Sequence, residues 1–407
     1  MLTSCPDNND ATTSGEGEDG LKTIQIECSK VQQTPFAQQS NKFANKFFGM
    51  VSKEAKDKNV NLCISPISMQ YILSIYANGL ADKDAQAVLD LLDMGSLEQV
   101  NANSSQLLNL LNEDDEYVKV AMVNGLWKQS GYNDVLPSFV ETIQTYYQAD
   151  TKDADFQNPE EAKKTINNWV SEKTDGQITD ANLKISEKAL TQLAWVNVTS
   201  FDAKWTYPFS AQNTMKGDFT NIDGTVSKVD MMKTTMGNVL AYSGEDVYMM
   251  ELPYGKGYYS MIVGLPYDTE KLDSICANTD WWKAHEQARG ESIELYMPKF
   301  TISTDLASLL ESGNFAPPML EKMGLDQSAA EAEMVKATNP ARQIWGLSQS
   351  ATIEVEENGT KAVTVTSSND GMYYSSTVPR RIDRPFFFAI RENTTGAILY
   401  MGKVVRL

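Results

Sequence analysis

The stretch that decides the fold runs from Glu356 to Ser376 and reads EENGTKAVTVTSSNDGMYYSS. Its first half alternates like a β-strand, with Lys361, Val363 and Val365 on one face and small side chains on the other. The small face comprises Thr360, Ala362, Thr364 and Thr366. The second half, SSNDGMYYSS, indicates an exposed loop with two tyrosines at its tip. We expect this loop to continue without regular structure as far as Pro385, and so long a segment in a compact domain is either disordered or functional.

The composition allows a large core and argues against two kinds of partner. The chain has 407 residues, of which 42% are hydrophobic. Its 54 acidic residues outnumber 35 basic ones, and the net charge is −19. A nucleic-acid-binding protein or a polybasic membrane-surface protein needs a basic surface, so both are disfavoured, and we predict no nucleic-acid partner. No apolar run reaches the roughly 18 residues that a membrane-spanning helix needs.

The single histidine argues against catalysis. Any Ser-His-Asp or Cys-His site would have to use His285. The sequence contains no GxSxG, HExxH, P-loop or GxGxxG motif. We therefore expect His285 to be a solvated surface residue, and we predict that the chain is not an enzyme and needs no metal or other cofactor.

The four cysteines are far apart and include no CxxC pair, which predicts neither a zinc site nor a disulfide framework. Cys63 lies in an apolar stretch and is expected to be a buried thiol. The residues Leu2-Thr3-Ser4-Cys5 resemble a bacterial lipobox, and the polar, acidic residues that follow suit a flexible tether. This predicts lipid attachment at Cys5 and an extracellular or cell-envelope location. The alternative is an ordinary disordered terminus with an unmodified cysteine.

The rest of the chain mixes helices and strands. Periodicity and capping residues predict helices at Thr34–Ala55, Ser65–Gly79 and Lys163–Thr174. Strands are predicted at Val118–Trp127, at Ala189–Phe201 and as a pair within Arg384–Val405, while strand and turn signals dominate from Met215 to Phe300. No repeat or Pro/Gly-rich linker divides residues 21–407. We predict a tether at residues 1–20 and one α+β domain at residues 21–407.

The chain resembles the serpin family over nearly all of residues 30–407. The similar segments occur in the family's order: NLCISPISMQYILSIYANGLADKDAQAVLDLL, INNWVSEKTDGQITD, NVTSFDAKWTYPFSAQNTMKGDF, VDMMK, ELPYGKGYYSMIVGLP, MPKF, LEKMGL, ATIEVEENGTKAVTVT and RPFFFAIRENTTGAILYMGKVV. The resemblance implies a serpin fold with a large five-stranded sheet, further sheets and about eight to nine helices. It also implies an exposed reactive-centre loop, here at about residues 358–380.

The resemblance implies a function for the opening stretch. In serpins the loop is bait for a protease, and after cleavage its N-terminal half enters the large sheet between the third and fifth strands. The expected insertion face, Thr360, Ala362, Thr364, Thr366 and Ser368, is small enough to enter a packed layer. Gly359 is expected to relieve the backbone at the pivot. We therefore predict a monomeric suicide inhibitor that forms a covalent 1:1 complex with a serine protease, and a cysteine protease is the less usual target.

Family spacing also implies individual site residues. Counting sixteen residues from the hinge glutamate Glu357 puts the cut between Tyr373 and Tyr374, whereas counting back from Pro385 puts it between Tyr374 and Ser375. An aromatic bait residue suits chymotrypsin-like, cathepsin-G-like or subtilisin-like enzymes. The resemblance further assigns Ser65, Ser68 and Asn197 to the shutter beneath the sheet, with Gln349 where the family usually has histidine. It assigns Trp205 to the breach at the top of the sheet, where insertion begins.

Two other functions remain open on the same fold. One is a non-inhibitory serpin that acts as a carrier or other binding protein. The other, binding of a polysaccharide or nucleic acid, is disfavoured by the charge. An N-glycosylation sequon at Asn358 would place a glycan at the hinge, which favours a bacterial origin over a glycosylating host.

Overall fold

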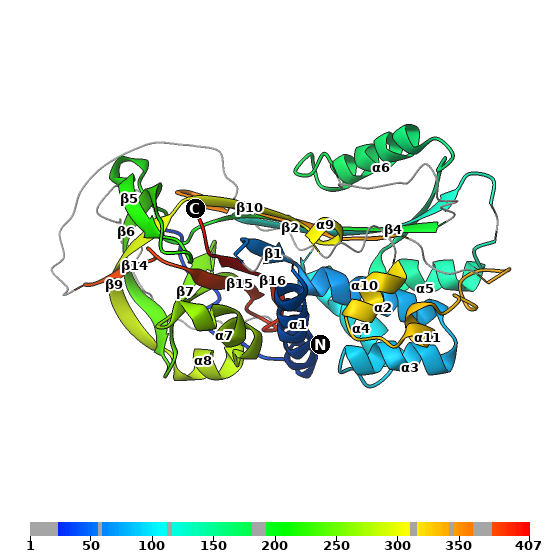
Figure 1. Ribbon diagram of the computed structural model, residues 1–407, viewed down its shortest axis with the longest axis horizontal. Helices are drawn as coiled ribbons and strands as arrows, with labels where there is room; N and C mark the ends of the chain where they lie inside the picture. The colour runs from blue at the N-terminus through cyan, green and yellow to red at the C-terminus, as the bar shows by residue number, and fades with distance from the viewer. Residues whose placement is uncertain are drawn as a thin grey trace.

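The computed structural model describes residues 23–55, 59–111, 116–132, 134–180, 193–309, 316–341, 346–360 and 377–407 (Figure 1). The helices are α1 Pro35–Glu54, α2 Pro66–Gly79, α3 Asp82–Leu91, α4 Leu97–Leu111, α5 Pro137–Tyr147, α6 Pro159–Lys173, α7 Leu272–Asn278, α8 Trp281–Gln287, α9 Leu306–Leu309, α10 Ala316–Lys322 and α11 Gln327–Ala330, with 3-10 turns η1 Ala211–Asn213 and η2 Thr269–Lys271. The strands are β1 Leu62–Ile64, β2 Val118–Gln129, β3 Asp150–Ala154, β4 Leu193–Lys204, β5 Met215–Thr220, β6 Val226–Ser243, β7 Val247–Tyr254, β8 Tyr259–Pro266, β9 Arg289–Pro298, β10 Phe300–Asp305, β11 Gly346–Ser348, β12 Ser350–Glu356, β13 Gly359–Thr360, β14 Val378–Arg381, β15 Phe386–Glu392 and β16 Ile398–Val404.

A seven-stranded sheet has the order β10-β12-β13-β4-β2-β3, and β11 pairs with β4. β11 and β12 are one run of chain interrupted at Gln349, and β13 has two residues. The sheet thus has five strands of at least five residues each, which are β10, β12, β4, β2 and β3. These five strands agree with the large five-stranded sheet that the resemblance implies, whereas the described residues form eleven α-helices against the expected eight to nine.

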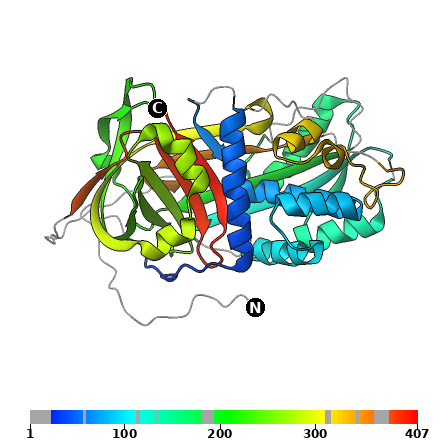
Figure 2. The same ribbon diagram turned by 60° about the horizontal axis from the view of Figure 1, so that its bottom comes forward.

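The second sheet has nine strands in the order β1-β16-β15-β8-β7-β6-β9-β14, with β5 paired to β6. The main hydrophobic core lies between this sheet, the inner face of the seven-stranded sheet and α1 to α5. A smaller cluster, which includes Val196, Val198, Ile166 and Trp169, joins the outer face of β4 to α6. Figure 1 shows α6 lying over that outer face, and Figure 2 shows α1 standing beside β15 and β16.

Two predicted helices begin where their caps indicate. Thr34 caps α1 by accepting a hydrogen bond from the Ala37 amide at 3.1 Å, and Pro35 follows at the first turn. Ser65 caps α2, whose residues are all buried except Asn78. Deep burial is what an apolar residue pattern on every face of α2 predicts.

The structure corrects the sequence-based prediction at two places. The region Met215–Phe300 also contains the helices α7 and α8, each of seven residues, which the strand signals obscured. The chain before Pro385 is not without structure, because Val378–Arg381 forms β14, which pairs in parallel with β9. None of the described helices is both long and apolar enough to cross a membrane.

Candidate functional site

The chain turns at Glu357 and Asn358, so that β12 and β13 form an antiparallel hairpin. β13 then lies between β12 and β4: Thr360 is paired with Val355 on one side and with Ala203 on the other. The two residues Gly359 and Thr360 therefore occupy the first positions of a central strand that runs antiparallel to both neighbours.

Thr360 and Gly359 are held tightly at this entry point. Thr360 is buried, and its hydroxyl shares a hydrogen bond of 2.7 Å with the phenol of Tyr254. A β-carbon at Gly359 would lie 1.9 Å from the carbonyl oxygen of Ala203. Gly359 does not have a positive φ, so glycine is required here by close approach of two backbones and not by an unusual pivot conformation.

Trp205 closes the top of the sheet. Its indole Nε1 donates to the Glu356 carbonyl at 2.9 Å, and its amide donates to the Asn358 carbonyl at 2.9 Å. The ring stacks on Tyr254 with 4.3 Å between ring centroids and 13° between planes. Trp205 thus contacts both the hairpin turn and the tyrosine that holds Thr360.

Two side chains hold Glu357 in place: Lys299, which lies between β9 and β10, and Thr214, which lies just before β5. Lys299 Nζ donates to its carboxylate at 2.8 Å, and Thr214 Oγ1 donates at 2.8 Å. Burial by itself raises the pKa of Glu357, but these hydrogen bonds and the positive charge of Lys299 outweigh it and lower the pKa below its ordinary value. The ion pair between Glu357 and Lys299 therefore fixes the position of the hinge turn.

Beneath the middle of the sheet, Ser65, Ser68 and Gln349 form one hydrogen-bonded network. Ser65 Oγ donates to the Leu399 carbonyl at 2.9 Å and lies 2.9 Å from Ser68 Oγ. Gln349 Nε2 donates to the Ser65 carbonyl at 2.8 Å, and the Ser65 amide donates to Gln349 Oε1 at 3.4 Å. The amide of Gln349 both donates and accepts, and unlike histidine it does not titrate near neutral pH.

The structure does not bring Asn197 into this network. Asn197 Nδ2 donates to Asn124 Oδ1 across the β4–β2 pair at 2.7 Å. Ser68 Oγ instead hydrogen-bonds with Thr199 Oγ1, and the Thr199 carbonyl accepts from the Tyr400 hydroxyl at 2.8 Å. The sequence did not single out Thr199, although the two-residue period of β4 puts it on the same face as Asn197.

β4 has two different partners on the side of the hairpin. Near its start it pairs in parallel with β11, with Val196 opposite Ser348, and near its end it pairs with β13, with Ala203 opposite Thr360. On its other side β4 pairs with β2 along its whole length. On this side β4 is therefore paired near both of its ends, and residues 197–202 of β4 lie between the two pairings.

The chain downstream of the predicted loop is fixed to the other sheet. Arg380 on β14 donates to Glu291 at 2.7 Å and lies over the Tyr248 ring at 4.2 Å from its centroid. Arg381 lies over the Tyr296 ring at 3.9 Å. The described strands on either side of residues 361–376 thus belong to different sheets, with β13 in one and β14 in the other.

The expectation of a solvated His285 is wrong. The side chain of His285 is 15% exposed, and Nδ1 shares a hydrogen bond of 2.9 Å with Glu251 Oε1. Arg391 Nη2 donates to Glu251 Oε2 at 2.6 Å. Burial alone would raise the pKa of Glu251, but the Arg391 guanidinium and the hydrogen bonds of His285 and Arg391 lower the pKa to about 2. His285 belongs to a structural ion-pair cluster.

The cysteine predictions are partly corrected. Cys63 is a buried free thiol as predicted, and Cys276 is also free and buried. Cys28, however, is disulfide-bonded, so the chain contains a disulfide that the wide cysteine spacing did not predict. The remaining predicted site residues lie outside the described residues: Cys5, Ala362, Thr364, Thr366, Ser368, Tyr373, Tyr374 and Ser375.

Comparison with known proteins agrees with this geometry. Serpin-ZX of Arabidopsis thaliana is 28% identical over 368 residues, which cover 86% of this chain and 92% of the plant protein. An alpha-1-antitrypsin homolog of Cyprinus carpio is 30% identical over 312 residues, or 75% of this chain and 80% of the fish protein.

Solved structures share the fold. Serpin48 of the insect Tenebrio molitor superposes with a TM-score of 0.75 at 24% identity, covering 91% of this chain and 98% of that one. Human thyroxine-binding globulin, in complex with thyroxine, superposes with a TM-score of 0.79 at 22% identity, covering 92% and 99%. The family model described as serpin (serine protease inhibitor) matches residues 38–407, and the chain belongs to the serpin family.

Proposed function

We propose that the chain is an irreversible suicide inhibitor of serine endopeptidases, and that it works by inserting its cleaved reactive-centre loop into the seven-stranded sheet. The β12–β13 hairpin is the observation that carries this proposal. Gly359 and Thr360 already pair with Lys204 and Ala203 of β4 and with β12 on the other side. A chain cut downstream needs only to extend this two-residue strand.

The pairing of β13 predicts the register of the inserted strand. Because each step along the loop moves one residue back along β4, Thr364 would lie opposite Thr199 and Thr366 opposite Asn197. On the β12 side, Thr366 would face Gln349. The shutter residues are therefore the ones that the inserting strand would pass, and insertion would have to separate β11 from β4.

The free energy gained by insertion makes the uncut state metastable. A strand of about fourteen residues adds hydrogen bonds worth roughly 0.5–1.5 kcal/mol net each, which sums to the order of 10 kcal/mol before packing. In this proposal the protease remains attached to the cut loop as an acyl-enzyme and is distorted as the strand enters. Serpins typically form complexes with their target proteases, and as a member of this family the chain is not an enzyme.

For the bait residue we propose Tyr373, with the cut before Tyr374. An aromatic side chain suits the primary pocket of chymotrypsin-like, cathepsin-G-like or subtilisin-like proteases. Mass spectrometry of the C-terminal fragment released by chymotrypsin tests the site, and a new N-terminus at Ser375 would instead identify Tyr374. Tyr373→Arg is expected to redirect the inhibitor toward trypsin-like proteases, whose pocket needs a cation.

A non-inhibitory carrier is the second candidate, because most serpins inhibit proteases but thyroxine-binding globulin does not. Incubation with chymotrypsin separates the two functions. An inhibitor gives a covalent 1:1 complex that survives SDS, whereas a carrier gives only a cleaved band. Exclusive appearance of the cleaved band over a range of protease ratios would overturn the inhibitory proposal.

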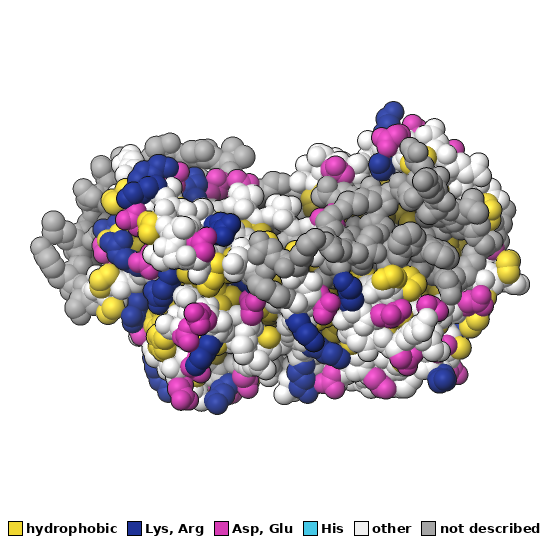
Figure 3. All heavy atoms as spheres, in the orientation of Figure 1, with side chains coloured by type: hydrophobic (Ala, Val, Ile, Leu, Met, Phe, Trp, Pro, Cys, Tyr) yellow, Lys and Arg dark blue, Asp and Glu magenta, His cyan; other side chains and the backbone are white. Residues whose placement is uncertain are grey.

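The surface charges of the described residues do not favour a polyanion-binding function. Basic side chains gather over β5 and β6 at the upper left of Figure 3, but acidic side chains lie among them. Lys216 pairs with Asp230 at 2.8 Å, and Lys228 pairs with Asp218 at 2.5 Å. With a net charge of −19, this arrangement offers little to a polysaccharide or nucleic acid.

We also propose that Cys5 carries a lipid and holds a monomeric protein at the outside of a bacterial cell. The support is the lipobox-like Leu2-Thr3-Ser4-Cys5 and the acidic residues after it. A cysteine in a disulfide cannot carry a thioether-linked lipid. Because Cys63 and Cys276 are free, Cys5 is the only other cysteine in this sequence, so the anchor requires that the disulfide of Cys28 is not formed in the lipidated protein. Intact mass of the protein purified from its own membrane, before and after reduction, decides between a lipid adduct and a disulfide.

A further inference from the structure

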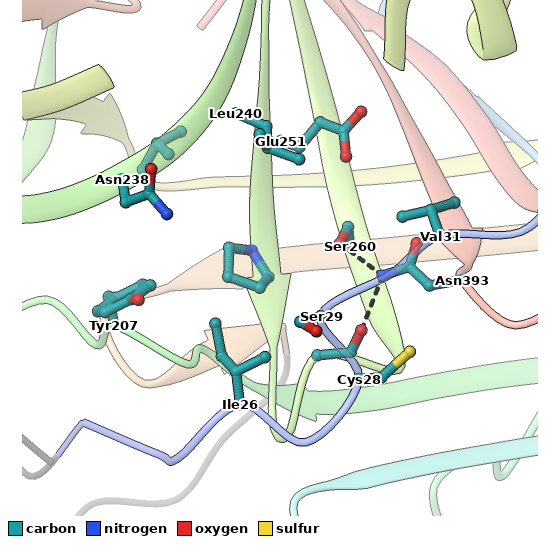
Figure 4. A pocket seen from close by; sticks show the side chains of 13 residues that line it. Ile26, Cys28, Ser29, Val31, Tyr207, Asn238, Leu240, Glu251, Ser260 and Asn393 are labelled. Atoms are coloured by element: carbon teal, nitrogen blue, oxygen red, sulfur yellow. Dashed lines mark hydrogen bonds between the residues drawn. The ribbon is translucent and has the colours of Figure 1, made fainter. Parts of the chain in front are cut away.

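A cavity of about 180 Å³ lies between the N-terminal segment and the nine-stranded sheet (Figure 4). Its walls come from residues 26–31, from β6, β7 and β8, and from Tyr207 and Asn393. Pockets for drug-sized ligands are usually roughly 300–1,000 Å³, whereas an apolar cavity of about 150 Å³ holds benzene. The cavity can therefore hold one single or fused ring.

The N-terminal segment, residues 24–32, covers the cavity and forms its roof. The Ile24 amide donates to the Thr206 carbonyl at 3.1 Å, the Cys28 amide to the Lys256 carbonyl at 3.0 Å, and the Gln32 amide to the Asn393 carbonyl at 2.8 Å. The roof also fits closely at Gly257, where a β-carbon would lie 2.7 Å from the Cys28 carbonyl oxygen. Because the roof is attached before and after the cavity, the space is preformed.

One wall is shaped by an irregularity in β6. The register with β9 shifts between Met236 and Val239, and Asn238 has a left-handed φ of 57°. A β-carbon at Gly290 would lie 2.0 Å from Asn238 Oδ1, so that oxygen faces Gly290. Figure 4 shows the amide nitrogen of Asn238 turned toward the cavity. Bulges of this kind re-aim side chains and are frequent beside binding sites.

A buried carboxylate forms part of the opposite wall. Glu251 lines the cavity, and its side chain is 10% exposed. Arg391 donates to both of its oxygens, at 3.3 and 2.6 Å, and His285 occupies a third position. A carboxylate has about four lone-pair sites, so one acceptor position remains for a donor inside the cavity.

The remaining walls suit an aromatic ring. Ile26, Leu240 and Pro253 supply apolar surface, and Figure 4 shows Tyr207 across the cavity from Glu251. Burial raises the pKa of Tyr207, so its phenol is neutral. A ligand carboxylate would be repelled by the negative charge of Glu251. A ligand cation would compete with Arg391, which already neutralises that charge, so an uncharged ligand fits best.

We propose that this cavity binds one small, uncharged aromatic ring that carries an N–H or O–H donor, and that the donor is accepted by Glu251. The ring lies against Ile26, Leu240 and Pro253. The site does not depend on loop insertion, so it can be tested whether or not the chain inhibits a protease.

Isothermal titration of the full-length protein with indole, 1-methylindole and indole-3-acetate tests the site and its chemistry. Indole is expected to bind one per chain. Binding of 1-methylindole, which lacks the donor, should be roughly tenfold weaker because the Glu251 acceptor stays unpaired. Indole-3-acetate should not bind measurably. Equal binding of indole and 1-methylindole would overturn the role of Glu251, and no saturable binding of indole would overturn the site.

Two cavity variants test whether indole binds in this cavity. Leu240→Phe fills the cavity and should abolish indole binding, whereas Val335→Phe makes the same kind of enlargement at a residue that is 47% exposed and does not line the cavity. Asn238→Gly keeps the left-handed backbone, removes one wall and should weaken indole binding severalfold, which gives a second test if Leu240→Phe does not fold. Indole binding that is unchanged in the folded cavity variants would contradict the proposal.

Discussion

The hydroxyl oxygens of Thr360 and Tyr254 lie 2.7 Å apart, at the point where β13 enters the seven-stranded sheet. Tyr254 is fully buried and stacks on Trp205, which in turn holds the turn of the hairpin through the Glu356 and Asn358 carbonyls. The first inward-facing residue of the hinge is thereby fixed to the breach before any cleavage. Removing this hydrogen bond therefore tests how firmly β13 is held in the sheet.

Tyr254→Phe is expected to loosen β13, since it leaves the buried Thr360 hydroxyl unpaired at a cost of about 1–2 kcal/mol. The measurement is hydrogen exchange of peptides covering residues 356–360, which should exchange severalfold to tenfold faster. Tyr267→Phe is the control, because Tyr267 is 56% exposed. Unchanged exchange in Tyr254→Phe would mean that the hydrogen bond does not hold the hinge.

Gly359→Ala should prevent β13 from forming in its present place, since the new β-carbon would lie 1.9 Å from the Ala203 carbonyl oxygen. We expect the variant to be cut by chymotrypsin as a substrate more often than it traps the enzyme. The number of inhibitor molecules consumed per protease inactivated should rise severalfold. Gly237→Ala is the matched control, because a β-carbon there meets nothing within 4 Å. Equal behaviour of both variants would contradict the close approach of β13 and β4.

Thr364→Arg tests the register of insertion. The pairing of β13 would bring residue 364 opposite Thr199 on the buried face, where an unpaired charge costs several kcal/mol. We expect the variant to become a substrate, again measured as inhibitor consumed per protease inactivated. Val363→Arg is the control, because it would lie on the opposite face of the strand, beside the exposed Thr352 on β12 and beside Ser200, which is 8% exposed, on β4. If the two arginines have the same effect, the assignment of the insertion face is wrong.

Local signals in the sequence were sufficient for the long elements. The Ser65-Pro66 cap predicts the start of α2, and the continuous apolar pattern predicts its burial, because both depend only on neighbouring residues. The alternation that begins at Thr360 predicts a strand there, but the partners of β13 were not predictable in this way, since Ala203 and Val355 come from two separate strands. Short helices such as α8 carry too few turns to establish a helical period.

The differences between prediction and structure at individual residues have the same origin. His285 and Arg391 converge on Glu251 from separate parts of the chain, so the burial of the histidine depends on the tertiary fold. In the shutter, family spacing indicated Asn197, whereas the described geometry joins Thr199 to Ser68. Motif spacing identifies the correct strand face but not which of its alternate residues makes the contact.

Glu251→Gln should destabilise the fold by about 3–5 kcal/mol at pH 7, because it leaves the buried Arg391 without its counter-ion. The pKa of Glu251 is about 2 in the folded protein against an ordinary value of 4.5. The unfolded chain therefore binds more protons between these values, so the contribution of Glu251 is fully present above pH 4.5 and disappears as the pH falls toward 2.

Thermal midpoints at pH 7 and pH 3, taken at one scan rate, measure this difference. The gap between wild type and Glu251→Gln should be wide at pH 7 and narrower at pH 3. Glu286→Gln changes an exposed carboxylate next to His285 and serves as the control. A gap that is the same at both pH values would contradict the buried ion pair.

Metastability of the uncut protein is the central claim, and melting of cut and uncut protein tests it most directly. The loop is nicked within residues 367–374 by a protease that the protein does not trap, the cut is verified by mass, and both forms are melted by circular dichroism. If the freed segment extends β13 into a full central strand, the midpoint should rise by tens of degrees, whereas the uncut form should melt irreversibly with a midpoint that depends on scan rate. An ordinary exposed loop, once cut, gains freedom in the unfolded chain and lowers the midpoint. A midpoint that falls or stays unchanged after a verified cut would contradict insertion and favour the non-inhibitory function.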